Sequence, residues 1–161
     1  MSAPIEWSRE ERVLYNPAFT ALVCASVVQG HLQAHRVGCP LPLVLTAAVM
    51  ALQPAIRALL PRVNASMTQW AENNQAVKVH MSANAPGLLS VVRPGLLFAL
   101  QAGVLTLKSS RVALRDGAIP ATIRRQSPEA AAIQKAAHML GRWLPSGGPT
   151  TTVLTLLGVR P

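Results

Sequence analysis

The stretch that begins at Pro94 has the most informative pattern of apolar and polar positions in the chain. Leu96, Leu97 and Leu100 recur at helical spacing, which predicts a short helix that starts at Pro94 and buries one face. Gly103 follows and supplies the permissive backbone that a helix needs at its C-terminal cap. The pattern therefore predicts that this helix ends just before Gly103.

Strict alternation replaces the helical period after this glycine and predicts a β-hairpin. The expected strands are residues 104–107 and 112–115, and residues 108–111 form the connection. The alternation places four apolar side chains on one face: Leu105, Leu107, Val112 and Leu114. Helix, glycine and hairpin in this order are typical of the closing half of a winged helix, a module that recognises or joins macromolecules.

The other segments are predicted to be mainly helical. Apolar spacing and proline or hydroxyl start signals predict helices over residues 17–35, over 42–51 with a kink or restart at Pro54, after Asn64 or Ser66, and from 128 to 144. Residues 77–81 alternate like an edge strand, and residues 84–92 predict a helix that Pro94 restarts or bends. The short apolar segment 150–157 fits a helix or a strand equally well.

Together these elements predict a mainly α fold of the α+β class. A chain of 161 residues suits a single domain, 1–161, and folding at this size buries about 70% of the surface that the unfolded chain exposes. We expect a helical N-terminal part of about residues 1–75 and a winged-helix-like part of about residues 76–161. Half of the residues are apolar but only 4% are aromatic, so small aliphatic side chains must fill the core.

The excess of basic over acidic residues indicates that the protein has a binding partner. Fifteen lysines and arginines face six carboxylates, which gives a net charge of +9, and the chain has no acid between Arg12 and Ala71. Cations without local partners imply an anionic partner, which is DNA, RNA, an anionic membrane or an acidic protein surface.

The densest basic set surrounds the predicted hairpin. Its members are Lys108, Arg111, Arg115, Arg124 and Arg125. On a wing, these cations would rest on DNA phosphates, add salt-dependent affinity and read no sequence. An acidic protein surface, or simple solvation of a basic face, accounts for the same residues, and the sequence leaves these three interpretations open.

Candidate chemistry is sparse, and we expect no catalytic residue, no metal and no cofactor. His31, His35 and Cys39 follow one another in steps of four, but Gly38 and Pro40 interrupt the helix that would align them as zinc ligands. The few carboxylates are not paired at useful spacing, and no nucleophile motif is present. The sequence therefore favours a protein that binds over an enzyme.

The two cysteines and the polar first twelve residues predict a cytoplasmic protein without a disulfide framework or a secretory leader. Residues 37–56 are uncharged, but the prolines and the glutamine within them favour a buried core helix over a membrane span. We expect no membrane partner.

Several short motifs occur along the chain in a recognisable order. They are Asn16-Pro17, Arg57 to Pro61, Trp70, Arg93, Lys135-Ala136, Gly141-Arg142-Trp143 and the terminal Leu157 to Pro161. In this order they resemble the middle components of bacterial three-component ABC-ATPase systems, which are defence operons similar to the Lamassu systems. The resemblance covers nearly the whole chain, and the terminal Leu-Gly-Val-Arg-Pro is its most specific part.

The resemblance implies a small non-enzymatic subunit between an SMC-like ABC ATPase and an effector such as a nuclease or a protease. Such a subunit would hold the effector inactive until the ATPase senses DNA. The surface expected to bind these partners consists of Arg57, Arg93, Arg142, Trp143 and Arg160, with the hairpin cations as secondary contacts to double-stranded DNA. The alternative is a stand-alone winged-helix regulator that binds DNA.

Overall fold

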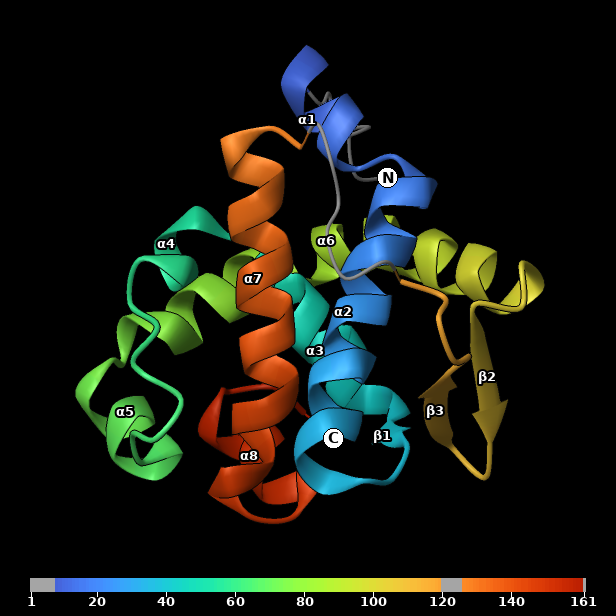
Figure 1. Ribbon diagram of the computed structural model, residues 1–161. Coiled ribbons are helices and arrows are strands. Elements are labelled where there is room, and N and C mark those ends of the chain that lie inside the picture. The colour runs from blue at the N-terminus through green and yellow to red at the C-terminus, as the bar shows by residue number, and fades with distance from the viewer. Residues whose placement is uncertain (1–7, 120–125, 161) are drawn as a thin grey trace.

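A computed structural model describes residues 8–119 and 126–160 of the chain (Figure 1). Over these residues the elements are α1 (Arg9–Leu14), α2 (Pro17–His35), β1 (Cys39–Pro40), α3 (Leu41–Ala51), α4 (Pro54–Arg57), α5 (Met67–Asn73), α6 (Ala76–Gln101), β2 (Leu105–Lys108), β3 (Arg111–Leu114), α7 (Pro128–Trp143), a 3-10 helix (Leu144–Gly147) and α8 (Thr150–Leu156). The fold is mainly α with one small antiparallel sheet, which confirms the predicted class.

Helix α2 lies at the centre of the molecule. It packs against α3, α6 and α7, and Figure 1 shows α7 alongside it while α6 crosses behind both. Its side chains Val23, Cys24, Val27 and Val28 are fully buried. The predicted N-terminal and C-terminal parts of the chain are therefore in direct contact through this helix.

Two glycines allow α2 and α7 to approach each other closely. A Cβ atom on Gly30 of α2 would lie 2.1 Å from the carbonyl oxygen of His138 in α7. A Cβ atom on Gly141 of α7 would lie 2.0 Å from the carbonyl oxygen of Val27 in α2. No side chain fits at these distances, so glycine at both positions sets the spacing of the two backbones.

Helix α6 corrects two predictions at once. Residues 77–81 form its first turns and are not a strand, and the helix continues without restart through Pro86 and Pro94. The alternating pattern misled because Val77 and Met81 are four residues apart and are both buried on one helical face. Both prolines are exposed, where the hydrogen bonds that they remove face solvent.

Several local signals are confirmed. Asn16, Ser66 and Ser127 cap α2, α5 and α7, and each side chain accepts a hydrogen bond from a backbone N–H of the first turn. The segment 150–157, which the pattern left open, is helical from Thr150 to Leu156. The uncharged stretch around α3 includes a core helix, because residues 43–50 lie largely inside the molecule.

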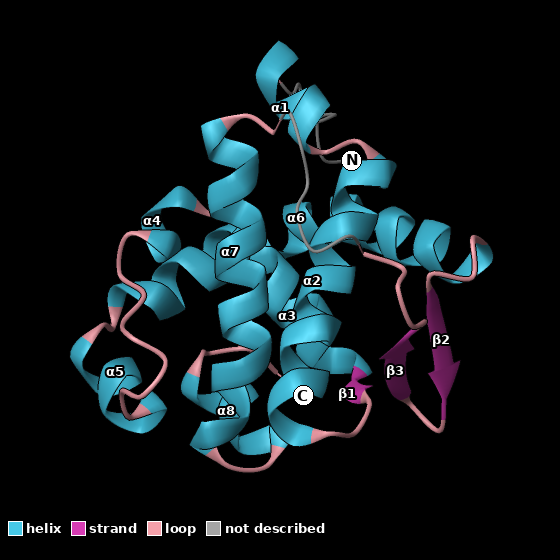
Figure 2. Cartoon of the chain, viewed as in Figure 1, coloured by secondary structure: helices cyan, strands magenta, loops and turns pink. Residues whose placement is uncertain are grey.

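The sheet has the strand order β1-β3-β2 and is antiparallel throughout (Figure 2). Gly103, with φ of 73°, ends α6 and turns the chain into β2, as the sequence predicts. Strand β1 was not predicted, since two residues that include Pro40 carry no periodic signal. Pro40 pairs with Arg111, and the N–H of Leu41 donates to the carbonyl of Ser110 at 2.9 Å.

The order of helix, glycine and hairpin is thus present, with a longer helix than expected. The assignment of this part to the winged-helix fold stays a prediction.

Candidate interaction surfaces

The hairpin of β2 and β3 ends in a two-residue turn that displays cations. Ser109 and Ser110 form the turn with φ values of 51° and 63°, which is the backbone of a type I′ turn. Lys108 and Arg111 are paired directly across it. Both side chains are exposed, so the tip of the hairpin holds two positive charges next to each other in solvent.

Arg111 is also tied to the strand beside it. Its Nη1 donates a hydrogen bond to the carbonyl oxygen of Gly38 at 2.8 Å. This bond orients the guanidinium group toward the segment that leads into β1, and a guanidinium group has further N–H donors that suit carboxylate or phosphate oxygens.

The apolar side of the hairpin is only partly buried. Leu105 and Val112 lie inside the core and Leu114 is half-buried. Leu107, on the same alternating positions, is 49% exposed. The reason is that β2 is the outer strand and its far end extends away from the helices (Figure 1).

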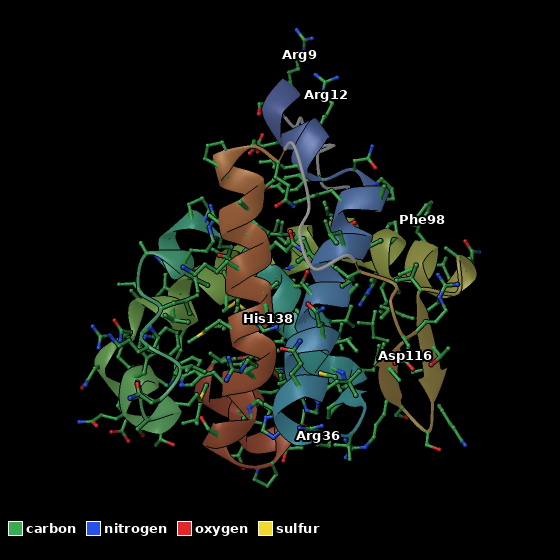
Figure 3. The ribbon with its side chains drawn as sticks, in the orientation of Figure 1. Arg9, Arg12, Arg36, Phe98, Asp116 and His138 are labelled. Carbon is green, nitrogen blue, oxygen red and sulfur yellow. The ribbon has the colours of Figure 1, made fainter. Side chains whose placement is uncertain are left out.

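The other hairpin cations lie at and beyond the end of β3. Arg115 is exposed and is followed by the exposed carboxylate of Asp116, which Figure 3 labels beside β3. The backbone N–H of Arg115 donates to the carbonyl of Val104 at 3.0 Å and so extends the pairing of the two strands. Arg124 and Arg125 lie outside the described residues.

Three of the five residues expected to bind partner proteins are exposed. They are Arg93 on α6, Arg142 on α7 and Arg160 near the C-terminal end. They come from three separate parts of the fold.

Arg57 makes its contacts within the chain. Its Nη1 donates to the carbonyl oxygen of Ala51 at 2.8 Å, at the end of α3. Its Nη2 lies 2.9 Å from the Oε1 atom of Glu129, in the first turn of α7. The guanidinium group thereby joins the end of one helix to the beginning of another.

Trp143 is a core residue with 1% of its surface exposed. Its indole N–H donates to the carbonyl oxygen of Ala65 at 2.8 Å. Its ring meets the ring of Trp70 edge to face, with the centroids 5.1 Å apart. The two tryptophans that the resemblance singled out therefore pack against each other inside the molecule.

The three residues examined as zinc ligands have other contacts. The Nδ1 atom of His31 is 3.0 Å from the carbonyl oxygen of Val37, and the Nε2 atom of His35 is 3.0 Å from that of Arg142. A carbonyl oxygen only accepts, so each of these ring nitrogens carries a proton. Cys39 lies in β1, and no group of three metal-ligating side chains occurs among the residues that the structure describes.

Burial dominates the titration of the groups in the core. It raises the pKa of the Cys24 and Cys39 thiols to about 12. It also lowers the pKa of His31 and of His138, and positive neighbours lower both further. Nε2 of His138 lies 2.9 Å from the side-chain oxygen of Gln33, so this imidazole joins α7 to α2. These groups are neutral and structural at pH 7.

The model of the ABC-three component (ABC-3C) system Middle Component 3 family matches residues 6–161. The chain belongs to this family. It is therefore a middle component of an ABC-three component defence system, in agreement with the resemblance of its short motifs. No curated protein and no solved structure matches the chain.

The middle component has an open depression between α1, α4 and α6. Tyr15, Gln53 and Asn84 are among the residues that line it. The buried amide of Gln53 accepts from Asn84 at 3.0 Å and donates to the carbonyl of Val49 at 3.3 Å. Burial, followed by the nearby carboxylate of Glu11, raises the pKa of Tyr15 and keeps its phenol protonated. The side-chain amides of Gln53 and Asn84 have hydrogen-bond partners, and the phenol of Tyr15 is neutral. These groups fit a role in joining the helices better than general acid or base catalysis.

Helix α6 of the middle component exposes apolar side chains, and the expectation that Leu97 shares a buried face with Leu96 and Leu100 is wrong. Val79 is 67% exposed, Leu97 55% and Phe98 48%. Figure 3 shows Phe98 projecting from the end of α6 that leads toward β2. Among the described helices, only α6 is long and apolar enough to cross a membrane by length and composition, a test that core helices of soluble proteins also pass. The two prolines made α6 look like several short segments in the sequence, and the exposed side of one continuous helix could not be recognised.

Proposed function

We propose that this middle component is a non-catalytic adaptor in the cytoplasm that bridges an SMC-like ABC ATPase and an effector, either a nuclease or a protease. It holds the effector inactive until the ATPase senses DNA. The match of residues 6–161 to a middle-component family carries the proposal, because a component of such a system has partner proteins. The excess of cations over carboxylates supports it, since acidic protein surfaces and nucleic acid both complement this charge.

We assign the contacts with these partners to the exposed arginines Arg93, Arg142 and Arg160, which lie on three separate parts of the fold. Arginine suits this role because its planar guanidinium group binds carboxylates through two parallel hydrogen bonds. Arg57 and Trp143 support the surface from within, through the bonds that fix the ends of α3 and α7.

The hairpin cations provide secondary contacts to double-stranded DNA within the complex. Lys108, Arg111 and Arg115 are exposed, and we assign Arg124 and Arg125 to the same contact from the sequence. Each phosphate contact adds affinity that falls as salt rises, without reading bases.

Co-purification tests the adaptor role. The chain, tagged and expressed together with its neighbouring genes, is expected to bring down a large ABC ATPase in stoichiometric amount. The double variant Arg111→Glu and Arg115→Glu is expected to keep the ATPase and to lose salt-sensitive DNA retention. Lys135→Glu, an exposed change on α7, is the matched control and should alter neither.

The exposed hairpin also favours the stand-alone regulator as a second candidate. A regulator binds duplex DNA without other proteins, with an affinity that falls steeply as salt rises. If the isolated chain does so and brings down no ATPase, the adaptor proposal is wrong.

A further inference from the structure

The solvent-facing side of α6 is a long, nearly uncharged surface. Val79 and Leu97 are eighteen residues apart, which is five turns of 3.6 residues, so their side chains leave the helix in the same direction. With the residues between them that leave the helix in about the same direction, they form what we call the outer stripe of α6. Its members are all exposed: Val79, Ala83, Pro86, Ser90, Pro94 and Leu97. The helix has 26 residues and is about 39 Å long.

The stripe is apolar although nothing in the described chain covers it. The inward side of α6 behaves differently, because Val77, Met81, Leu88 and Val92 are buried there. A helix that needs only one partner face has polar residues on the other, so a second apolar face indicates a second packing partner.

The polar groups on this side specify the chemistry of that partner. Helix α6 has no carboxylate, and Arg93 lies beside the stripe between Ser90 and Leu97. Pro86 and Pro94 have no N–H, so the carbonyls of Ser82 and Ser90 lack the donor that normally follows four residues later. The surface thus offers apolar contact, one cation and two hydrogen-bond acceptors.

We propose that the outer stripe of α6 is the docking site for an amphipathic helix of another protein component of the same system, with a carboxylate placed opposite Arg93. This inference rests on the proposed adaptor function and assigns its principal contact to α6. The partner helix packs its apolar face along the stripe, and its carboxylate accepts hydrogen bonds from the guanidinium group.

A second copy of the chain fits this surface poorly. Two outer stripes face to face would bring the Arg93 side chains of the two copies into the same interface, and α6 has no acid to pair with them. Each chain also has a net charge of +9, which opposes self-association. A lipid bilayer fits poorly as well, because two prolines and an arginine lie within the apolar stretch.

The test uses exposed substitutions in the tagged chain, expressed with its neighbouring genes. Leu97→Glu and Arg93→Glu are expected to reduce the amount of co-purified component at least tenfold. The first places a charge against the apolar face of the partner helix, and the second places a negative charge opposite the partner's carboxylate. Arg93→Lys keeps the charge and should retain most of the binding. Thr68→Glu on α5 and Lys135→Glu on α7 are the matched controls and should change the yield less than twofold.

A photo-crosslinking residue at Val79 or Leu97 identifies the occupant directly. We expect the crosslinked product to contain a component encoded beside this chain. A crosslinked dimer of the chain, or sedimentation of the isolated chain with vesicles of phosphatidylglycerol and phosphatidylcholine, would overturn the proposal. Undiminished co-purification of all α6 variants would refute the α6 site but leave the adaptor function standing, whereas a wild-type chain that brings down no component refutes the function itself.

Discussion

Arg57 and Glu129 form an ion pair with their nearest charged atoms 2.9 Å apart, and this pair connects α4 to the first turn of α7. The arginine side chain is 14% exposed and the glutamate side chain 50%. The same guanidinium group donates to the carbonyl of Ala51. Glu129 also lies at the positive end of the α7 dipole, so it has a second source of stabilisation.

Arg57→Ala is expected to lower the free energy of unfolding by about 2 kcal/mol, because it removes a charged donor from the part-buried Ala51 carbonyl as well as the ion pair. Glu129→Gln removes only the half-exposed partner and is expected to cost less than about 1 kcal/mol. Urea denaturation of the two variants measures both values. Equal losses would show that the carbonyl contact contributes little.

The close approach of α2 and α7 predicts that Gly141→Ala is destabilising. A methyl group at this position would overlap the carbonyl of Val27, so the helices must separate at a cost of roughly 1–3 kcal/mol. Lys135→Ala, on the exposed side of the same helix, is the control and should change stability little. A thermal melt of Gly141→Ala that matches the wild type would contradict the packing described for these helices.

Acid is expected to destabilise the fold through His31. Its pKa in the folded chain is lowered below the unfolded value of about 6.5, so the unfolded chain binds more protons in the window between the two values. The contribution of neutral His31 to the free energy of unfolding is therefore complete above about pH 6.5. It is lost as the pH falls from the pKa of the unfolded chain toward the lower pKa of the folded chain.

Denaturation of the wild type and of His31→Asn at pH 7.5 and pH 5.5 measures this effect. The asparagine amide can still donate to the Val37 carbonyl but does not titrate, so the variant should lose less stability on acidification. His138, whose pKa is also lowered by burial, keeps a smaller dependence in the variant. Stability that rises as the pH falls in the wild type would contradict the prediction.

Both cysteines are expected to be unreactive in the folded chain. Each thiol is buried, and its pKa of about 12 leaves almost no thiolate at pH 8. A thiol-reactive dye should modify neither cysteine in buffer and both cysteines in guanidinium chloride. Rapid modification of the native protein would show that Cys39 in β1 is accessible.

The sequence was sufficient wherever a local signal determines the structure. Asn16, Ser66 and Ser127 each bond a backbone N–H of the helix that follows, and this interaction needs no distant residue. The hairpin was predicted for the same reason, since Gly103 and the alternation after it act locally.

The failures have a tertiary origin. Next to Pro94, Gly95 lets α6 pack closely against Thr20 of α2, and the helix is continuous there. Strand β1 exists because Arg111 and Val112 of β3 pair with a two-residue segment, Cys39–Pro40, far away in the chain. The hydrophobic periodicity of the sequence predicts neither of these contacts.

The candidate surfaces were also predicted only in part. Composition predicted an exposed cationic hairpin tip, which Lys108 and Arg111 form. Short motifs predicted the family, but they also assigned Trp143 to a partner-binding surface. In the structure this side chain lies inside the core. A conspicuous tryptophan marks packing as readily as binding, and only the fold distinguishes the two.

The central claim is that the middle component bridges two proteins. The most direct measurement is purification of the tagged ABC ATPase from cells that contain the effector, with and without this chain. Our account predicts that the effector accompanies the ATPase only when the chain is present, and that it is lost when the chain carries Leu97→Glu. Recovery of the effector with the ATPase in the absence of the chain would contradict the bridging role.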